Sequence, residues 1–161
     1  MEPKMVTRDA FTLMGVMERF AHGNEDFEGI WKRFMRYHDQ IQPLSTDKVY
    51  YGVYFVIDEG KELDCLAGMA VADVDSIPDG LVVREVPAAR YAVFECTVET
   101  ISDTYDWIFG QWLKTAPYAR PGENSPKADF ERYPPATDSG DTPVLIHIVL
   151  EDEPEEEQGS Q

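Results

Sequence analysis

Apolar and polar residues follow strand-like or helix-like patterns along most of the chain. The segment MVTRDAFTLMGVM (5–17) is rich in β-branched and aromatic residues and predicts a first strand. In EDFEGIWKRFMRYHDQI (25–41), apolar residues recur at helical spacings after an acidic start, which predicts an amphipathic helix. Two strand-like runs follow, KVYYGVYFVI (48–57) and DCLAGMAVADV (64–74), with turn residues between them.

The same order of elements recurs in the second half of the chain. RYAVFECTV (90–98) predicts a strand, ISDTYDWIFGQWLKTA (101–116) a helix, and ADFERY (128–133) and TPVLIHIVLE (142–151) two further strands. The two halves therefore predict an α+β fold of duplicated βαββ units. We expect an antiparallel sheet with two helices on one side and a ligand cleft between the units.

Length and charge limit the classes of protein to which the chain can belong. Its 161 residues suggest one domain, which we expect over 1–150 in halves of about 1–80 and 81–150. The remaining segment, EDEPEEEQGSQ (151–161), predicts a disordered acidic tail. A net charge of −17 argues against nucleic acid as a direct partner, because phosphate contacts need clustered Lys and Arg. Neither a membrane-spanning run nor a signal peptide is visible, so we expect a cytoplasmic protein without membrane contact.

Cysteine and histidine residues do not form a metal-binding pattern. Cys65 and Cys96 lie in predicted strands and are expected to be buried free thiols, with a disulfide as the alternative. His22, His38 and His147 are scattered singly. Because no phosphate-binding glycine loop or nucleophile motif appears either, we expect neither a metal nor a cofactor.

The segment DFERY contains a carboxylate between aromatic residues. Strand alternation puts Glu131 and Tyr133 on one face, and Phe130 and Arg132 on the other. A carboxylate in an aromatic-lined cavity suits a lipophilic cation, because ring faces attract the cation and the carboxylate neutralises it where water is scarce. The alternative is that Glu131 faces water beside a basic neighbour and that the aromatic residues only form core.

Several segments together resemble the GyrI-like domain, the effector-binding module of AraC-type and MerR-type regulators and of free-standing bacterial proteins. They are PAARYAVFECTV, ISDTYDWIFGQWLKTAPY, DFERYPP and the final VLIHIVL. The resemblance covers residues 2–150 and implies a duplicated βαββ fold with a ligand cleft. It also implies that the acidic residue of the F-E-x-Y strand, here Glu131, meets cationic, hydrophobic ligands. The candidate aromatic wall residues are Tyr51, Tyr91, Trp107 and Tyr133, together with Trp31 and Tyr105, for which the protein core is the alternative.

The resemblance leaves two functions open. The first is a free-standing protein that binds lipophilic, cationic small molecules, in drug or effector sensing or in sequestration. The second is a hydrolase of strained cyclopropane-bearing compounds, with Glu131 and Tyr91 acting in the same cleft. Because no helix-turn-helix pattern flanks the predicted domain, we expect any regulatory role to be that of a sensor or sequestering protein, or to act through a protein partner such as gyrase or a regulator.

Overall fold

The computed structural model describes residues 2–57, 60–122, 125–134 and 143–151. The strands are β1 (Lys4–Arg8), β2 (Phe11–Ala21), β3 (Ser45–Ile57), β4 (Glu62–Val71), β5 (Val82–Val86), β6 (Ala89–Thr97), β7 (Asp129–Tyr133) and β8 (Pro143–Leu150). The helices are α1 (Phe27–Ile41), α2 (Ile101–Trp107) and α3 (Leu113–Thr115), with a π-helical stretch (Ile108–Trp112) joining the last two. In these ranges the strands form one antiparallel sheet in the order β1-β6-β8-β7-β3-β4-β2-β5.

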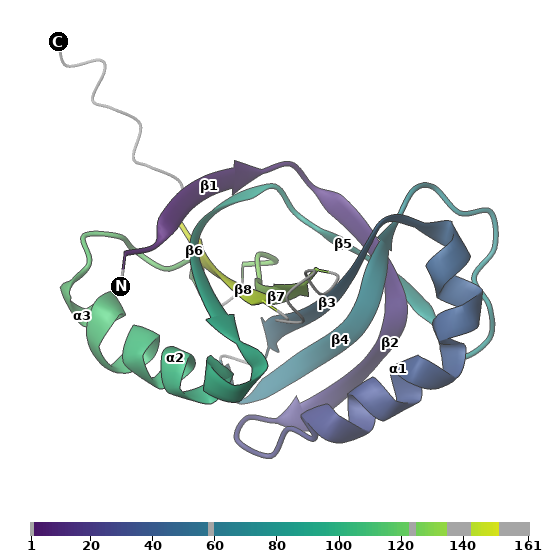
Figure 1. Cartoon of the computed structure of the whole chain (residues 1–161), viewed down its shortest axis with the longest axis horizontal. Coiled ribbons are helices and arrows are strands. Elements are labelled where there is room, and N and C mark those ends of the chain that lie inside the picture. Colours follow the sequence, from purple (N-terminus) through teal and green to yellow (C-terminus); the bar gives the residue numbers. More distant parts are fainter. Residues whose placement is uncertain (1, 58–59, 123–124, 135–142, 152–161) are drawn as a thin grey trace, which may run out of the picture.

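The sheet curls into a half-barrel, with the helices outside it (Figure 1). Two βαββ units, β2-α1-β3-β4 and β6-α2-β7-β8, meet where β3 pairs with β7. The units also exchange short strands, because β1 pairs with β6 and β5 pairs with β2. The predicted α+β fold with duplicated units is confirmed. The expectation of one continuous strand over 5–17 was wrong, since β1 crosses to the second unit and only β2 stays in the first.

The helices cover one face of the sheet, which we call the outer face. From α1, Ile30, Phe34 and Ile41 pack on residues of β2 and β4. Ile108 packs on Phe94 and other residues of β6 and β8. Burying each such side chain contributes about 1.5–3 kcal/mol, so amphipathic spacing fixes which helix surface meets the sheet.

The opposite, inner face packs on itself as the sheet curls. Tyr51, Tyr91 and Phe130 lie in one buried cluster there, together with Phe11 and Val53. Tyr91 and Phe130 meet edge to face with their centroids 5.0 Å apart. Strand alternation therefore sends side chains from the same strands into two separate environments.

Both cysteines are buried and free, Cys65 on β4 and Cys96 on β6, as expected. In the described ranges, no helix is long and apolar enough to cross a membrane. The same ranges contain no group of three or more His, Cys, Asp or Glu residues placed to hold a metal ion. Of the expected acidic tail, residues 152–161 lie outside the described part of the chain.

Candidate functional site

Glu131 lies on β7, the strand through which the second unit pairs with β3 of the first. It pairs with Gly52 of β3 on one side and with Ile146 of β8 on the other. Its exposed fraction is only 3%. The alternative of a water-facing charge is therefore wrong, because the pairing of β7 between two strands directs this side chain under the helices.

Three tyrosine hydroxyls surround the Glu131 carboxylate. Tyr54 of β3 donates to both carboxylate oxygens at 2.9 Å, and Tyr105 of α2 donates to Oε2 at 2.6 Å. Tyr133 of β7 donates to Oε1. Among the described residues these hydroxyls are its hydrogen-bond partners, and they come from both units. The carboxylate is thus held by neutral donors, and no basic side chain in the described part of the chain bonds to it.

Burial and hydrogen bonding oppose each other at this site. Burial raises the pKa of Glu131, and the bonds from the three tyrosines lower it without cancelling the rise. Burial and the nearby carboxylate also raise the pKa values of Tyr54 and Tyr105 well above their ordinary range, so both hydroxyls stay protonated as donors. Because the folded-state pKa of Glu131 is raised, its ionisation lowers the stability of the fold as pH increases through that value.

Removing one donor should shift this balance. We expect Tyr105→Phe to raise the pKa of Glu131 further, because the ionised carboxylate loses its 2.6 Å bond. The free energy of unfolding should fall by about 1 kcal/mol. The measurement is an NMR titration of the glutamate carboxyl carbons, with Tyr118→Phe as the control, whose ring stacks on Trp112. A pKa of Glu131 that is unchanged or lowered by Tyr105→Phe would contradict this account.

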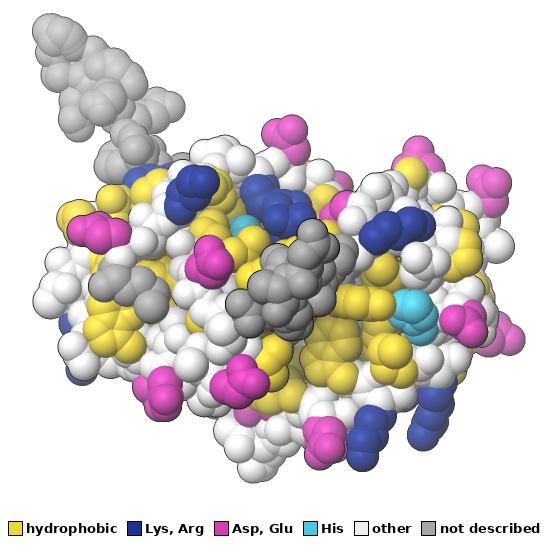
Figure 2. Space-filling view, in the orientation of Figure 1, with side chains coloured by type: hydrophobic (Ala, Val, Ile, Leu, Met, Phe, Trp, Pro, Cys, Tyr) yellow, Lys and Arg dark blue, Asp and Glu magenta, His cyan; other side chains and the backbone are white. Residues whose placement is uncertain are grey.

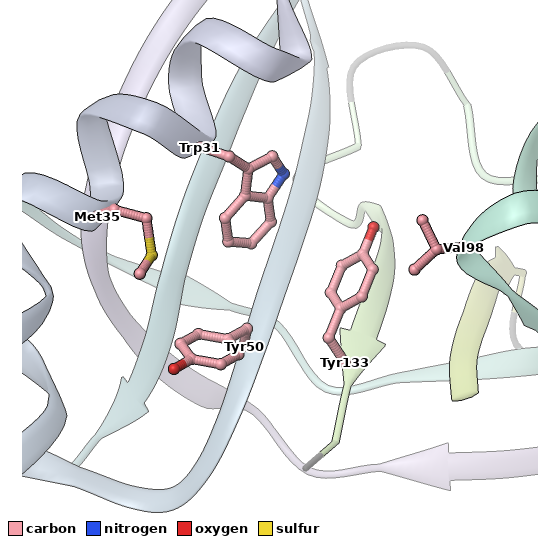
Figure 3. Close-up of a pocket in the computed structure, with 5 residues that line it drawn as sticks. All are labelled: Trp31, Met35, Tyr50, Val98 and Tyr133. Carbon is pink, nitrogen blue, oxygen red and sulfur yellow. The ribbon is translucent and has the colours of Figure 1, made fainter. Parts of the chain in front are cut away.

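An apolar pocket of about 390 Å³ opens on the outer face (Figure 3). Glu131 does not line it, but Tyr133, whose hydroxyl bonds Glu131, does. We call it the aromatic pocket; its lining residues are Trp31 and Met35 of α1, Tyr50 of β3, Tyr133 of β7, and Val98. Trp31 and Tyr133 meet edge to face with their centroids 5.6 Å apart. Met35 and Val98 are each more than half exposed and form an apolar mouth. Tyr133 both lines the pocket and bonds Glu131, so it connects the open space to the buried carboxylate.

The structure brings together four of the residues singled out from the sequence. Glu131, Tyr105 and Tyr133 are hydrogen-bonded, and Trp31 packs against Tyr133 in the pocket wall. Trp107 instead packs edge to face on Phe94, at 6.1 Å between centroids, and does not line the aromatic pocket.

Tyr51 and Tyr91 are placed on the inner face, on the other side of the sheet from Glu131. Tyr51 is the neighbour of Gly52, the residue that pairs with Glu131, so alternation turns its side chain away. Tyr91 packs against Phe130, which points away from Glu131 for the same reason. The structure therefore does not bring either hydroxyl to the carboxylate, and Glu131 and Tyr91 do not share a cleft.

Four residues of the site were not among the sequence candidates: Tyr54, Tyr50, Met35 and Val98. The signal that identifies Tyr54 is Gly52, because a glycine within a strand often marks a close approach. A Cβ on Gly52 would lie 3.3 Å from Trp31 Cζ2 and from the Tyr54 hydroxyl, and 3.4 Å from Glu131 Oε1. The missing side chain leaves the space that these groups fill.

Comparison with known sequences decides the family. The family model for integron-associated effector-binding proteins matches residues 4–149. The chain belongs to this family. A curated relative, the transcriptional regulator BrlR of Pseudomonas aeruginosa, is 32% identical over 136 residues, or 83% of this chain. The aligned region is 48% of that regulator, so the chain spans about half the length of this relative.

Solved structures share the fold of this effector-binding protein. SAV2435 bound to tetraphenylphosphonium has a TM-score of 0.77 at 14% identity, with 94% of each chain covered. An integron cassette protein of Vibrio cholerae has a TM-score of 0.67 at 19% identity, covering 92% of this chain and 95% of its own. At such identities the likeness concerns the fold alone. With the family match, it confirms the resemblance to the GyrI-like domain, a fold that binds small-molecule effectors.

Proposed function

We propose that this protein binds lipophilic, cationic small molecules in the aromatic pocket, with Glu131 as the anchoring charge. The observation that carries the proposal is a carboxylate only 3% exposed, held by three neutral hydroxyls and lying behind an apolar pocket. A buried charge without a partner of opposite sign is costly. A ligand cation supplies that partner, and its apolar body replaces water in the pocket.

The pocket walls suit such a ligand. The faces and edges of Trp31, Tyr50 and Tyr133 offer apolar contact, and aromatic faces attract cations. A volume of about 390 Å³ is in the range of small-molecule sites. Movement of the Tyr133 ring would open the pocket to Glu131 while Tyr54 and Tyr105 keep the carboxylate in place. The shared fold with SAV2435, whose structure contains tetraphenylphosphonium, supports this ligand class.

The hydrolase interpretation lacks comparable support. It needs Glu131 and Tyr91 in one cleft, and these side chains point to opposite faces of the sheet. The three hydroxyls around Glu131 also donate to it rather than leave it open to accept a proton from a nucleophilic water. We therefore favour binding without turnover, in sensing or sequestration of a drug or effector.

The proposal is tested with a charged ligand and a neutral one of similar shape. Tetraphenylphosphonium and triphenylphosphine oxide are titrated separately, with tryptophan fluorescence as the readout because Trp31 lines the pocket. We expect saturable binding of the cation to one site, with an affinity at least about tenfold above that of the neutral compound. Equal affinity for the two compounds would show that charge plays no part in recognition.

Affinity for the cation should also depend on pH. The raised pKa of Glu131 means that part of the free protein is protonated above the usual glutamate range, and a cation binds only the ionised form tightly. Affinity should therefore increase as pH rises through the pKa of Glu131 in the free protein, then level off. Isothermal titration in buffers of different ionisation enthalpy measures the protons released, up to one per ligand. An affinity that falls with rising pH in this window would contradict the assignment.

A further inference from the structure

A second cavity, of about 510 Å³, lies on the inner face, away from the aromatic pocket. It runs along β1, β6, β8 and the end of β7, and we call it the inner cavity. Its apolar walls are Val6, Val93 and Leu145, and its basic groups are Lys4, Arg8 and Arg132. In the space-filling view, Lys and Arg side chains gather beside a histidine in the upper middle of the face (Figure 2).

Two arginines converge in this cavity, and neither has a carboxylate partner of its own among the described residues. Arg8 Nη2 lies 3.5 Å and Arg132 Nε 3.3 Å from the same acceptor, the Tyr51 hydroxyl oxygen. That hydroxyl in turn donates to Asp47 Oδ2 at 2.6 Å. Within the described ranges neither guanidinium forms an ion pair. Since the chain has 31 acidic residues and only 14 Lys and Arg, two adjacent arginines that form no ion pair with a described carboxylate stand out.

Two buried polar atoms beside these arginines also lack partners in the described structure. They are Arg8 Nε and the hydroxyl of Tyr91, a residue with 0% exposure. Tyr91 pairs with Val6, which lines the cavity, and its ring packs on Phe130 and His147. An unsatisfied buried donor is unfavourable and rare in folded proteins. Arg8 lines the inner cavity and Tyr91 does not, so an acceptor bound in the cavity can satisfy Arg8 Nε.

The remaining titratable groups define the charge of the site. His147 is buried, its Nδ1 donates to the Leu145 carbonyl at 3.1 Å, and burial lowers its pKa to about 3, with a contribution from the two arginines. It therefore adds no positive charge at neutral pH. At the rim, the exposed Glu2 and Glu95 disfavour the binding of an anion, and the exposed Lys4 favours it. The two arginines make the interior cationic, and the Asp47 carboxylate, bonded to the Tyr51 hydroxyl, offsets part of that charge.

We propose that the inner cavity is a second binding site, for a small organic carboxylate. Arg8 and Arg132 hold the carboxylate, because guanidinium groups match its geometry and remain charged. Arg8 Nε also donates to it, and Val93 and Leu145 contact the apolar body of the ligand. Alternation along β7 thus presents Glu131 to a cation site on one face and Arg132 to an anion site on the other. This inference does not depend on the function proposed for the aromatic pocket.

The test compares benzoate with benzamide, which has the same shape and no charge. We expect benzoate to bind saturably at one site, with NMR shift changes in β1, β6 and β8, and benzamide to bind at least about tenfold more weakly. Arg132→Gln should weaken benzoate binding by about tenfold or more. Glu131→Gln is the matched control and should leave benzoate affinity unchanged, so failure of one site is distinguishable from failure of the other.

Equal affinities for benzoate and benzamide, or no saturable benzoate binding in the millimolar range, would overturn the proposal.

Discussion

Glu131→Gln is expected to lower the affinity for tetraphenylphosphonium by about thirtyfold or more while the protein stays folded. Glutamine has the same shape as glutamate but no charge, so only the electrostatic partner of the cation is lost. A desolvated charge pair of this kind contributes about 2 kcal/mol or more, which corresponds to that factor. Isothermal titration of both proteins at the same pH and ionic strength measures the difference.

The tyrosines around the site can form hydrogen bonds with a glutamine in place of Glu131. A glutamine side chain can accept from Tyr54 or Tyr105 through its oxygen and donate through its nitrogen to the Tyr133 hydroxyl oxygen. We therefore expect the variant to be at least as stable as the wild type at alkaline pH, where the buried carboxylate is ionised. Asp106→Asn, an exposed change of the same charge next to Tyr105, is the control and should bind normally. If wild type and Glu131→Gln bind tetraphenylphosphonium with equal affinity, Glu131 is not the residue that anchors the cation.

Gly15→Ala should have the largest effect on stability, a loss of about 4 kcal/mol in the free energy of unfolding. Gly15 of β2 pairs with Gly68 of β4, and an added Cβ would lie 2.0 Å from the Ala67 carbonyl oxygen and 2.6 Å from Gly68 Cα. These are backbone atoms of a paired strand, so they cannot rotate aside as a side chain would. Urea denaturation monitored by circular dichroism gives the change.

Gly110→Ala is the matched control for this substitution. Gly110 lies in the π-helical stretch, and a Cβ there would meet no atom within 4 Å. Alanine lowers the backbone entropy of the unfolded chain, so stability should rise by up to about 1 kcal/mol. If Gly15→Ala and Gly110→Ala change stability alike, the close approach of β2 and β4 does not limit the fold.

The elements of the fold could be predicted from the sequence because their signals are local. The three-to-four residue spacing in 25–41 and 101–116 indicated helices, and the structure has them over Phe27–Ile41 and from Ile101 to Thr115. The exchange of β1 and β5 between units could not be predicted in this way. This exchange depends on which strands pair across long stretches of sequence, and the apolar pattern of a strand does not determine which strand it pairs with.

The site shows the same division between local and distant information. Alternation within β7 placed Glu131 and Tyr133 on one face, and the hydrogen bond between them agrees. Alternation alone could not tell whether Tyr51 or Tyr54 of β3 meets Glu131, because that depends on the register of two strands far apart in sequence. In the structure Gly52 pairs with Glu131, so Tyr54, two residues further along β3, lies on the same face as Glu131 and bonds it.

The most direct test of the central claim is a crystal structure of the protein with tetraphenylphosphonium. We expect the cation in the aromatic pocket between Trp31 and Tyr133, with its charged centre within about 6 Å of an aromatic ring centroid and on the side of Glu131. The Tyr133 ring should have moved, while Tyr54 and Tyr105 still donate to Glu131. A cation bound elsewhere, with the carboxylate still held by all three tyrosines, would contradict the account.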